Sequence, residues 1–313
     1  MTGWTIEDMP PLRDRTVVVT GANSGLGLEG SKAFARRGAT VVMACRSVER
    51  GESAAKEIRD AVPNATLDVR ECDLADLSNV ASFADGLRAD YDAVDILCNN
   101  AGVMAIPRSE TADGFETQFG VNHLGHFALT GHLLDLLGAA DSESRIVTQS
   151  SGAHEMGEID FDDLQRERSY GKWSAYGQSK LANLLFAYEL QRRLGNHGWD
   201  DVLSVACHPG YADTDLQFRG PREMGSTLRT AAMGVANAVF AQSAEQGALP
   251  MLYAATAEDV IGGEYVGPGG LFDMRGSPEF QQSNDASQDE ETAEQLWAVS
   301  TDLTGVEYDF ERT

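Results

Sequence analysis

Lysine is scarce in this sequence, and acidic side chains outnumber basic ones. The 313 residues include 49 acidic and 24 basic residues, of which only four are lysine, and the formal net charge is −25. A surface of this sign repels nucleic-acid phosphates and anionic lipid headgroups, so we expect neither as a partner. An acidic, lysine-poor composition is typical of proteins from salt-loving cytoplasms, where salt screens the self-repulsion. An ordinary acidic protein is the alternative.

Cysteine and long apolar runs are also scarce. The four cysteines are Cys45, Cys72, Cys98 and Cys207. Each lies in or beside an apolar run and none has metal-ligand spacing, so we expect buried free thiols and no metal site. No apolar run approaches the ~20 residues that a membrane span needs, and residues 1–8 lack the features of a signal peptide. We therefore expect a cytoplasmic protein without a membrane span.

Short apolar runs alternate with longer helical patterns. The predicted strands are Thr16–Thr20, Thr40–Ala44, Thr66–Arg70, Val94–Cys98, Arg145–Gln149 and Val202–Cys207. The predicted helices are Leu26–Arg37, Val48–Asp60, Ser78–Arg88, Phe115–Leu137 and Tyr176–Leu194. Apolar strands separated by helices indicate a parallel sheet covered on both faces. The predicted fold class is therefore α/β, with a doubly wound sheet of Rossmann topology.

We expect a single domain over residues 1–313, with a core of about 12–270 and a peripheral tail over 271–313. Two polar, mixed segments interrupt the alternation, namely Gly152–Ala175 and Tyr211–Leu228. Both follow predicted strands and should lie at the carboxyl edge of the sheet, where ligands bind in such folds. The tail contains an acidic segment, Asn284–Glu294, and a short helical pattern around Leu296–Val299.

A glycine-rich turn joins the first predicted strand to the first predicted helix. It reads Thr20-Gly21-Ala22-Asn23-Ser24-Gly25-Leu26-Gly27. Glycines let the backbone approach a pyrophosphate, and the helix N-terminus offers N–H groups and a positive dipole end to the phosphates. The spacing G-x-x-x-G-x-G resembles that of the short-chain dehydrogenase/reductase family. The expected contacts with a dinucleotide come from Gly21, Asn23, Ser24, Gly25, Leu26 and Gly27.

The resemblance runs from about Thr16 to Gly210. It implies that Asp73, followed by Leu74, binds the adenine after the third strand. It also implies that the NNAG motif lines the adenosine pocket after the fourth strand, through Asn99, Asn100, Ala101 and Gly102. A simple turn is the alternative reading of this motif. Its position directly after a buried strand favours the pocket.

Arg46 follows the second predicted strand, where NAD-selective enzymes usually carry an acidic residue for the ribose 2′-hydroxyl. A guanidinium can instead bind a 2′-phosphate through two parallel hydrogen bonds. We therefore expect NADP(H) as the cofactor. NAD stays an alternative, in which Arg46 only stacks on the adenine.

Tyr176 and Lys180 form a Tyr-x-x-x-Lys pattern, which places both side chains on one helix face. A nearby ammonium and an oxidised nicotinamide would both lower the tyrosine pKa. A tyrosine tuned in this way can take a proton from an alcohol or give one to a carbonyl. A Tyr/Lys pair on a solvated helix face is the alternative.

The family resemblance adds further site residues. It implies that Ser151 holds the substrate oxygen, with Ser150 as the neighbouring candidate, and that Asn122 anchors a water in a proton relay. It also places Lys180 on the nicotinamide ribose. Residues expected beside the nicotinamide are Pro209, Gly210 and Thr214.

The interval between Ser151 and Tyr176 is longer than many members of the family need. This insertion resembles the retinol dehydrogenase and protochlorophyllide reductase branch, which handles bulky apolar alcohols, aldehydes and ketones. The candidate apolar pocket residues are Met156, Phe161, Tyr170 and Trp173, which could equally pack the insertion onto the body. The histidines His123, His126, His132 and His154 form no metal pattern, and we expect them to be solvated or packed on helices.

The resemblance also raises the question of partners and of other functions. Family members often pair through two long helices, here Phe115–Leu137 and Tyr176–Leu194, so a homo-oligomer is one expectation. A member with a substrate-side insertion can instead be monomeric. The alternative functions are a non-catalytic NADPH sensor, a scaffold that binds partners through Asn284–Glu294, and an extended-family epimerase. The intact Tyr-x-x-x-Lys pattern, the glycine spacing and the short tail favour the oxidoreductase.

Overall fold

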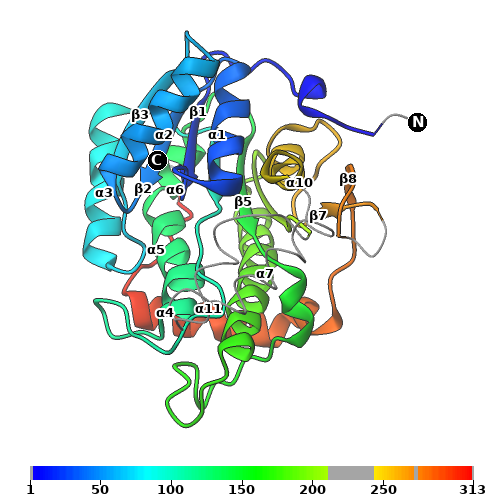
Figure 1. The fold of residues 1–313 in the computed structure, drawn as a ribbon. Coiled ribbons are helices and arrows are strands. Elements are labelled where there is room, and N and C mark those ends of the chain that lie inside the picture. Colours follow the sequence, from blue (N-terminus) through cyan, green and yellow to red (C-terminus); the bar gives the residue numbers. More distant parts are fainter. Residues whose placement is uncertain (1–2, 211–242, 271–273, 312–313) are drawn as a thin grey trace, which may run out of the picture.

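The computed structural model describes residues 3–210, 243–270 and 274–311. Its strands are β1 (Thr16–Thr20), β2 (Thr40–Cys45), β3 (Thr66–Glu71), β4 (Ile96–Asn99), β5 (Ser144–Gln149), β6 (Val202–Cys207), β7 (Tyr265–Pro268) and β8 (Pro278–Phe280). They form one sheet in the order β3-β2-β1-β4-β5-β6-β7-β8, parallel except for β8, which pairs antiparallel with β7 (Figure 1). The predicted α/β doubly wound sheet is confirmed, and β7 and β8 were not predicted.

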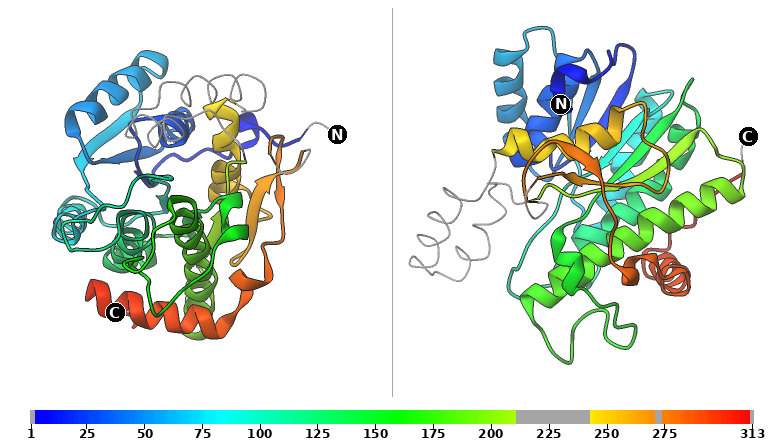
Figure 2. Two further views of the ribbon diagram at one scale, coloured as in Figure 1. Left: turned by 60° about the horizontal axis from the view of Figure 1, so that its bottom comes forward. Right: turned by 90° about the vertical axis from the view of Figure 1, so that its right-hand side faces the viewer.

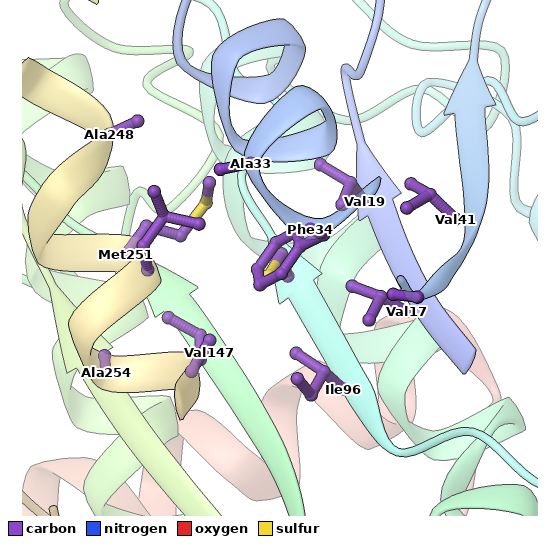
Figure 3. Close-up of a cluster of buried hydrophobic side chains, with 14 of the residues drawn as sticks. Val17, Val19, Ala33, Phe34, Val41, Ile96, Val147, Ala248, Met251 and Ala254 are labelled. Carbon is purple, nitrogen blue, oxygen red and sulfur yellow. The ribbon is translucent and has the colours of Figure 1, made fainter. Parts of the chain in front are cut away.

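Helices cover both faces of the sheet (Figure 2). They are α1 (Gly25–Arg36), α2 (Val48–Ala61), α3 (Leu77–Asp90), α4 (Thr117–Phe119), α5 (Gly125–His132), α6 (Leu134–Gly138), α7 (Lys172–Asn196), α10 (Ala244–Thr256) and α11 (Glu290–Thr304). Successive strand residues point to opposite faces. Val19 packs with Phe34 of α1 and Met251 of α10 (Figure 3), whereas Val18 packs with Phe127 of α5 on the other face. An apolar core therefore lies on each face of the sheet.

The predicted helix Phe115–Leu137 is not one regular helix. It consists of α4, a π-helical segment η2 (Gly120–Leu124), α5 and α6. The break between α5 and α6 lies at Leu133, which has φ −101° and ψ 3°. Wider π-helical turns are rare and often mark functional sites. Here the π-helical segment contains Asn122.

The described part of the segment expected as a peripheral tail packs into the body of the protein. Strand β8 extends the sheet, and α11 packs across α7 (Figure 2). Trp297 stacks on Phe186 of α7 with ring centroids 5.9 Å apart. The Tyr308 hydroxyl donates to the carbonyl of Phe127 at 2.7 Å. The expectation of a peripheral position is therefore wrong for residues 274–311, because buried aromatic side chains join them to the core.

The ends of β1, β4 and β5 lead into the glycine turn, the NNAG motif and Ser151, respectively. Parallel strands bring their carboxyl ends to one edge of a sheet. This edge also receives the first turn of α7, which begins four residues before Tyr176. In the part of the chain that is described, no helix combines the length and apolar character needed to cross a membrane.

Candidate active site and nucleotide cleft

The glycine turn between β1 and α1 is tightly built. Gly21 and Gly25 adopt left-handed backbone angles, with φ of 68° and 54°. A Cβ atom on Gly27 would lie 2.4 Å from the carbonyl oxygen of Gly21, so only glycine is accommodated there. The Ser24 side chain makes no capping hydrogen bond at the start of α1. The first N–H groups of α1 are therefore open to an anion.

A cavity of about 190 Å³, here called the nucleotide cleft, lies along this turn. It is lined by predicted cofactor residues, namely Gly21, Asn23, Ser24, Gly25, Leu26, Gly27, Arg46, Asp73, Leu74, Asn100, Ala101 and Gly102. Amide donors at a helix N-terminus, guanidinium groups and a carboxylate at one cleft match the phosphates, ribose and adenine of a dinucleotide. The donor set therefore fits the adenosine and phosphate half of NAD(H) or NADP(H).

Asn99 does not line the nucleotide cleft, although the NNAG resemblance placed it there. Its side chain is fully buried, and its Nδ2 donates to Thr130 Oγ1 at 2.9 Å. Asn100 does face the cleft, and its Nδ2 donates to the carbonyl of Thr20 at 2.7 Å. The side chain of Asn99 thus supports the end of β4, while Asn100 ties the motif to the glycine turn.

Two arginines line the nucleotide cleft. Arg46 is exposed after β2, and Arg50 follows one turn later on α2. Neither forms an ion pair with any residue that the structure describes. Sequence reasoning missed Arg50, although its spacing from Arg46 on the start of a helix was visible. The pair presents uncompensated positive charge where a 2′-phosphate would lie.

Tyr176 and Lys180 are both buried on α7, with 4% and 3% of their surfaces exposed. The Lys180 ammonium donates to the carbonyl of Gln149 at 2.9 Å, and its Nζ lies 5.9 Å from the centre of the Tyr176 ring. Asn183 Nδ2 donates to the same carbonyl, also at 2.9 Å. The end of β5 therefore orients the lysine beside the tyrosine, and the alternative of a solvated pair is wrong.

The structure distinguishes between the two candidate serines. Ser150 is buried, and its hydroxyl donates to the backbone carbonyl of Lys180 at 2.8 Å. Ser151 is partly exposed, accepts a hydrogen bond from the Ala153 amide at 3.2 Å and also hydrogen-bonds to Tyr176. Ser151 is thus the serine whose hydroxyl is placed beside the tyrosine.

Burial dominates the ionisation of the pair. It raises the pKa of Tyr176 to about 12, against the hydrogen bond with Ser151, which lowers it. Burial also lowers the pKa of Lys180 to about 8, opposed by the nearby Cys207. The depressed tyrosine pKa expected from the sequence is therefore not found in the protein alone. With these values Tyr176 is protonated at neutral pH and can act as a proton donor.

Asn122 closes the site from the π-helical segment. Its Oδ1 accepts from the Val103 amide at 2.8 Å, and its Nδ2 donates to the Val103 carbonyl at 3.0 Å and to Ser179 Oγ at 2.9 Å. A Cβ on Gly102 would lie 3.0 Å from Asn122 Oδ1 and 3.7 Å from Lys180 Nζ. Gly102 of the NNAG loop therefore lies close to both Asn122 and Lys180.

The remaining nicotinamide-side candidates are only partly described. Pro209 and Gly210 follow β6, and Gly210 has a left-handed φ of 64°. A Cβ there would lie 2.4 Å from the Met274 carbonyl oxygen, which explains the glycine. Thr214 and the segment Tyr211–Leu228 lie outside the described residues.

The four aromatic and methionine residues of the insertion divide into two pairs. Tyr170 donates to the carbonyl of Ile106 at 2.9 Å, and Phe161 packs against a buried cluster, so both hold the insertion on the body. Met156 and Trp173 are 61% and 46% exposed. Met156 lies against Gly177, and the Trp173 ring centroid is 6.2 Å from that of Tyr176. Of these residues, Trp173 contacts the Tyr176 ring, and Met156 lies beside the next residue of α7, Gly177.

All four cysteines are buried free thiols, as predicted. Within the described ranges, no group of His, Cys, Asp or Glu could hold a metal ion. His123 and His126 are buried and hydrogen-bonded rather than solvated.

Comparison with known proteins agrees with this geometry. A family model described as short chain dehydrogenase matches residues 15–223. Retinol dehydrogenase 13 from Homo sapiens is 44% identical over 310 residues, covering 98% of this chain and 89% of that protein. The crystal structure of an uncharacterised protein from Mycobacterium paratuberculosis is 44% identical with a TM-score of 0.81, covering 98% of this chain and 100% of that one.

A structure from Beutenbergia cavernae, named as an NAD(P)-dependent gluconate 5-dehydrogenase and containing NADP at low occupancy, is 27% identical. Its TM-score is 0.61, and the match covers 81% of this chain and 94% of that one. The family match spans most of the chain and includes the glycine turn, Ser151, Tyr176 and Lys180. The chain therefore belongs to the short-chain dehydrogenase family, in its retinol dehydrogenase-like branch.

Proposed function

We propose that this oxidoreductase uses NADP(H) to interconvert a bulky apolar alcohol and the corresponding aldehyde or ketone, with Tyr176 as the proton donor and acceptor. The observation that carries the proposal is the placement of the Tyr176 hydroxyl beside Ser151, with Lys180 on the same helix face. When bound, the nicotinamide supplies or accepts the hydride.

The residues of the site account for the proton. In the reducing direction the Ser151 and Tyr176 hydroxyls hold the carbonyl oxygen, which gains the Tyr176 proton as the carbon gains hydride. The buried, protonated tyrosine suits this role at neutral pH. In the oxidising direction the Tyr176 oxygen must receive the proton of the alcohol hydroxyl. The positive charge of Lys180 would favour the phenolate that accepts it.

The cofactor preference rests on Arg46 and Arg50. Both line the nucleotide cleft without an ion-pair partner among the described residues. A 2′-phosphate would supply the missing negative charge, whereas a 2′-hydroxyl would not. The NADP bound in the Beutenbergia cavernae structure supports the same cofactor.

The substrate class rests on the surroundings of Tyr176. Trp173 exposes apolar surface next to Tyr176, and Met156 exposes apolar surface beside Gly177 on the same helix. An apolar substrate would cover both. The name of the human relative, retinol dehydrogenase 13, refers to a large apolar alcohol and supports this class.

The proposal is tested by titrating NADPH and NADH against the protein and following nicotinamide fluorescence. The bound NADPH is then offered to a panel of apolar aldehydes and ketones. We expect tighter binding of NADPH than of NADH, and oxidation by the larger apolar carbonyls. Tight binding without turnover on any carbonyl would favour the sensor or scaffold, and no binding of either nucleotide would refute the proposal.

A further inference from the structure

His126 makes a second connection between the nucleotide cleft and the π-helical segment, besides the hydrogen bonds between Asn122 and Val103. It lies on α5, one turn after Asn122, and 1% of its surface is exposed. Its Nδ1 is 2.9 Å from the backbone carbonyl oxygen of Asn122, and its Nε2 is 2.9 Å from the hydroxyl of Thr20. Thr20 directly precedes the glycine turn. The imidazole therefore spans from the nucleotide cleft to the π-helical segment.

The partners determine where the ring carries its proton. The carbonyl of Asn122 can only accept, so His126 Nδ1 must donate. In the neutral ring Nε2 is then an acceptor, and the Thr20 hydroxyl must donate to it. Burial lowers the pKa of His126 to about 4; the hydrogen bond to Asn122 opposes this shift, and the charge of Lys180 adds to it. The ring is neutral at physiological pH.

The hydroxyl of Thr20 can meet this requirement. It accepts from the amides of Asn100 and Ala101, both at 2.9 Å, which uses its acceptor capacity. Its single proton is left to donate, and His126 Nε2 at 2.9 Å is closer than the alternative acceptor, the Cys98 carbonyl at 3.2 Å. Both imidazole nitrogens therefore have a hydrogen-bond partner. Thr20 donates to His126, and His126 donates to Asn122.

We propose that His126 is a positioning residue that couples the nucleotide cleft to Asn122 and thereby to the proton-transfer site. This inference rests on the proposed function. Thr20 holds Asn100 and Ala101, which line the cleft, whereas Asn122 holds Ser179, the neighbour of Lys180. His126 joins the two groups, so cofactor binding in the cleft and alignment of Asn122 share one hydrogen-bonded chain.

His123 provides a matched control for His126. It is also 1% exposed, it lies three residues before His126 on the adjoining π-helical segment, and burial lowers its pKa to about 3. Its Nε2 is 2.9 Å from Ser300 Oγ on α11, so it is hydrogen-bonded on the side away from the cleft. The variants His123→Phe and His126→Phe each remove a buried imidazole, but only the second interrupts the link.

Imidazole ¹⁵N NMR of the full chain tests the link without any measurement of turnover. We expect His126 to be neutral at pH 7 with its proton on Nδ1, and its nitrogen shifts to move on addition of NADPH while those of His123 stay constant. An Nε2–H tautomer, a charged ring or unchanged His126 shifts with NADPH bound would overturn the proposal. If the wild-type protein failed to oxidise NADPH with any of the carbonyls, the proposed function would be refuted. The NMR spectra would still decide the role of His126.

Kinetics test the consequence. We expect His126→Phe to lower kcat about tenfold, because the Asn122 carbonyl loses its imidazole donor and Asn122 is held less firmly. The Kd for NADPH should change less than about threefold, because the bonds from Asn100 and Ala101 to the Thr20 hydroxyl stay in place. His123→Phe should keep kcat within about twofold. Equal kcat for the two variants, with only thermal stability reduced, would show that His126 is merely structural.

A double-mutant cycle with Thr20 tests the route. Thr20→Val removes the hydroxyl at nearly constant shape. If His126 acts through Thr20, adding His126→Phe to Thr20→Val should lower kcat by less than about twofold further. A full additional tenfold loss would show that the histidine acts independently of the cleft.

Discussion

At the scale of single residues, Arg46 and Arg50 offer the most direct test of cofactor choice. Each lies exposed at the cleft and has no ion-pair partner among the described residues. Arg46→Asp would replace a phosphate ligand with a repelling charge. We expect the Kd for NADPH to rise about tenfold or more and that for NADH to change little, as measured by fluorescence titration.

The control for this prediction is Arg36→Asp, which makes the same charge change at the exposed end of α1 that is remote from the glycine turn. It should leave both dissociation constants near their wild-type values. An unchanged preference in Arg46→Asp would remove Arg46 as the 2′-phosphate ligand.

Lys180 illustrates a conflict between stability and chemistry. Burial lowers its pKa from 10.5 to about 8, so the folded protein binds its proton less tightly than the unfolded chain does. The contribution of Lys180 to the free energy of unfolding therefore rises with pH between about 8 and 10.5. This contribution is lowest below pH 8. Lys180→Met should raise the free energy of unfolding at pH 7 by up to about 3 kcal/mol while greatly reducing turnover.

The gain in Lys180→Met should shrink as the pH rises through 8 towards 10.5, because the wild-type lysine then becomes neutral in the folded state. Urea unfolding at several pH values measures it. A variant that is less stable than wild type at pH 7, or whose gain is independent of pH, would show that burial of the ammonium is not the dominant effect.

At the scale of elements, the insertion between β5 and α7 is divided between packing and substrate. Tyr170 and Phe161 attach it to the body, whereas Trp173, in the first turn of α7, faces Tyr176. We expect Trp173→Ala to raise KM at least about fivefold for bulky apolar aldehydes, through loss of buried apolar contact. For a small aldehyde KM should be nearly unchanged.

Comparison with Trp173→Phe separates packing from size, since phenylalanine keeps an aromatic surface beside Tyr176. This variant should retain most of the affinity for bulky substrates. The same change in KM for large and small aldehydes would place the substrate elsewhere.

The elements that could be predicted from the sequence are those with a local pattern. The strand of Thr16–Thr20 and the glycine turn were recognisable because apolar runs and glycine spacing are properties of a few neighbouring residues. The π-helical segment at Asn122 was not predictable, because it depends on contacts with Val103 and Ser179 far along the chain. Strands β7 and β8 are short, and their pairing is likewise set by tertiary contacts.

The candidate site shows the same division. The spacing of Tyr176 and Lys180 is local and was predicted, whereas the direction of their pKa shifts follows from burial, which a sequence does not display. Choosing between Ser150 and Ser151 from physical contacts required knowing that the first is bonded to the carbonyl of Lys180. The role of His126 became visible only when Thr20 and Asn122 were found on either side of its ring.

At the scale of the whole molecule, the C-terminal segment completes the core. Trp297 contacts Phe127 and Tyr308 at ring distances of 5.1 and 4.5 Å, and the Arg193 guanidinium lies 4.5 Å from the centre of its ring. We expect Trp297→Ala to reduce the free energy of unfolding by about 3–5 kcal/mol, the cost of removing a large buried side chain. Urea unfolding at constant salt measures this loss.

The matched variant is Trp173→Ala, whose indole is 46% exposed and should cost less than about 1 kcal/mol. If Trp297→Ala were equally mild, the segment would be peripheral after all.

The packing of the C-terminal segment also bears on assembly, because α11 covers α7 and the Tyr308 side chain packs against α5. Pairing of two copies through these helices would require that cover to be displaced, so we expect no dimer through them in sedimentation at micromolar concentration.

The central claim is that Tyr176 transfers the proton in a reaction driven by bound NADP(H). The most direct measurement compares wild type and Tyr176→Phe for NADPH binding and for single-turnover reduction of an apolar aldehyde. We predict that binding is retained and that the rate falls at least about hundredfold, because the phenyl ring keeps the packing and lacks the proton. Full activity of Tyr176→Phe on a substrate that wild type reduces well would contradict the account.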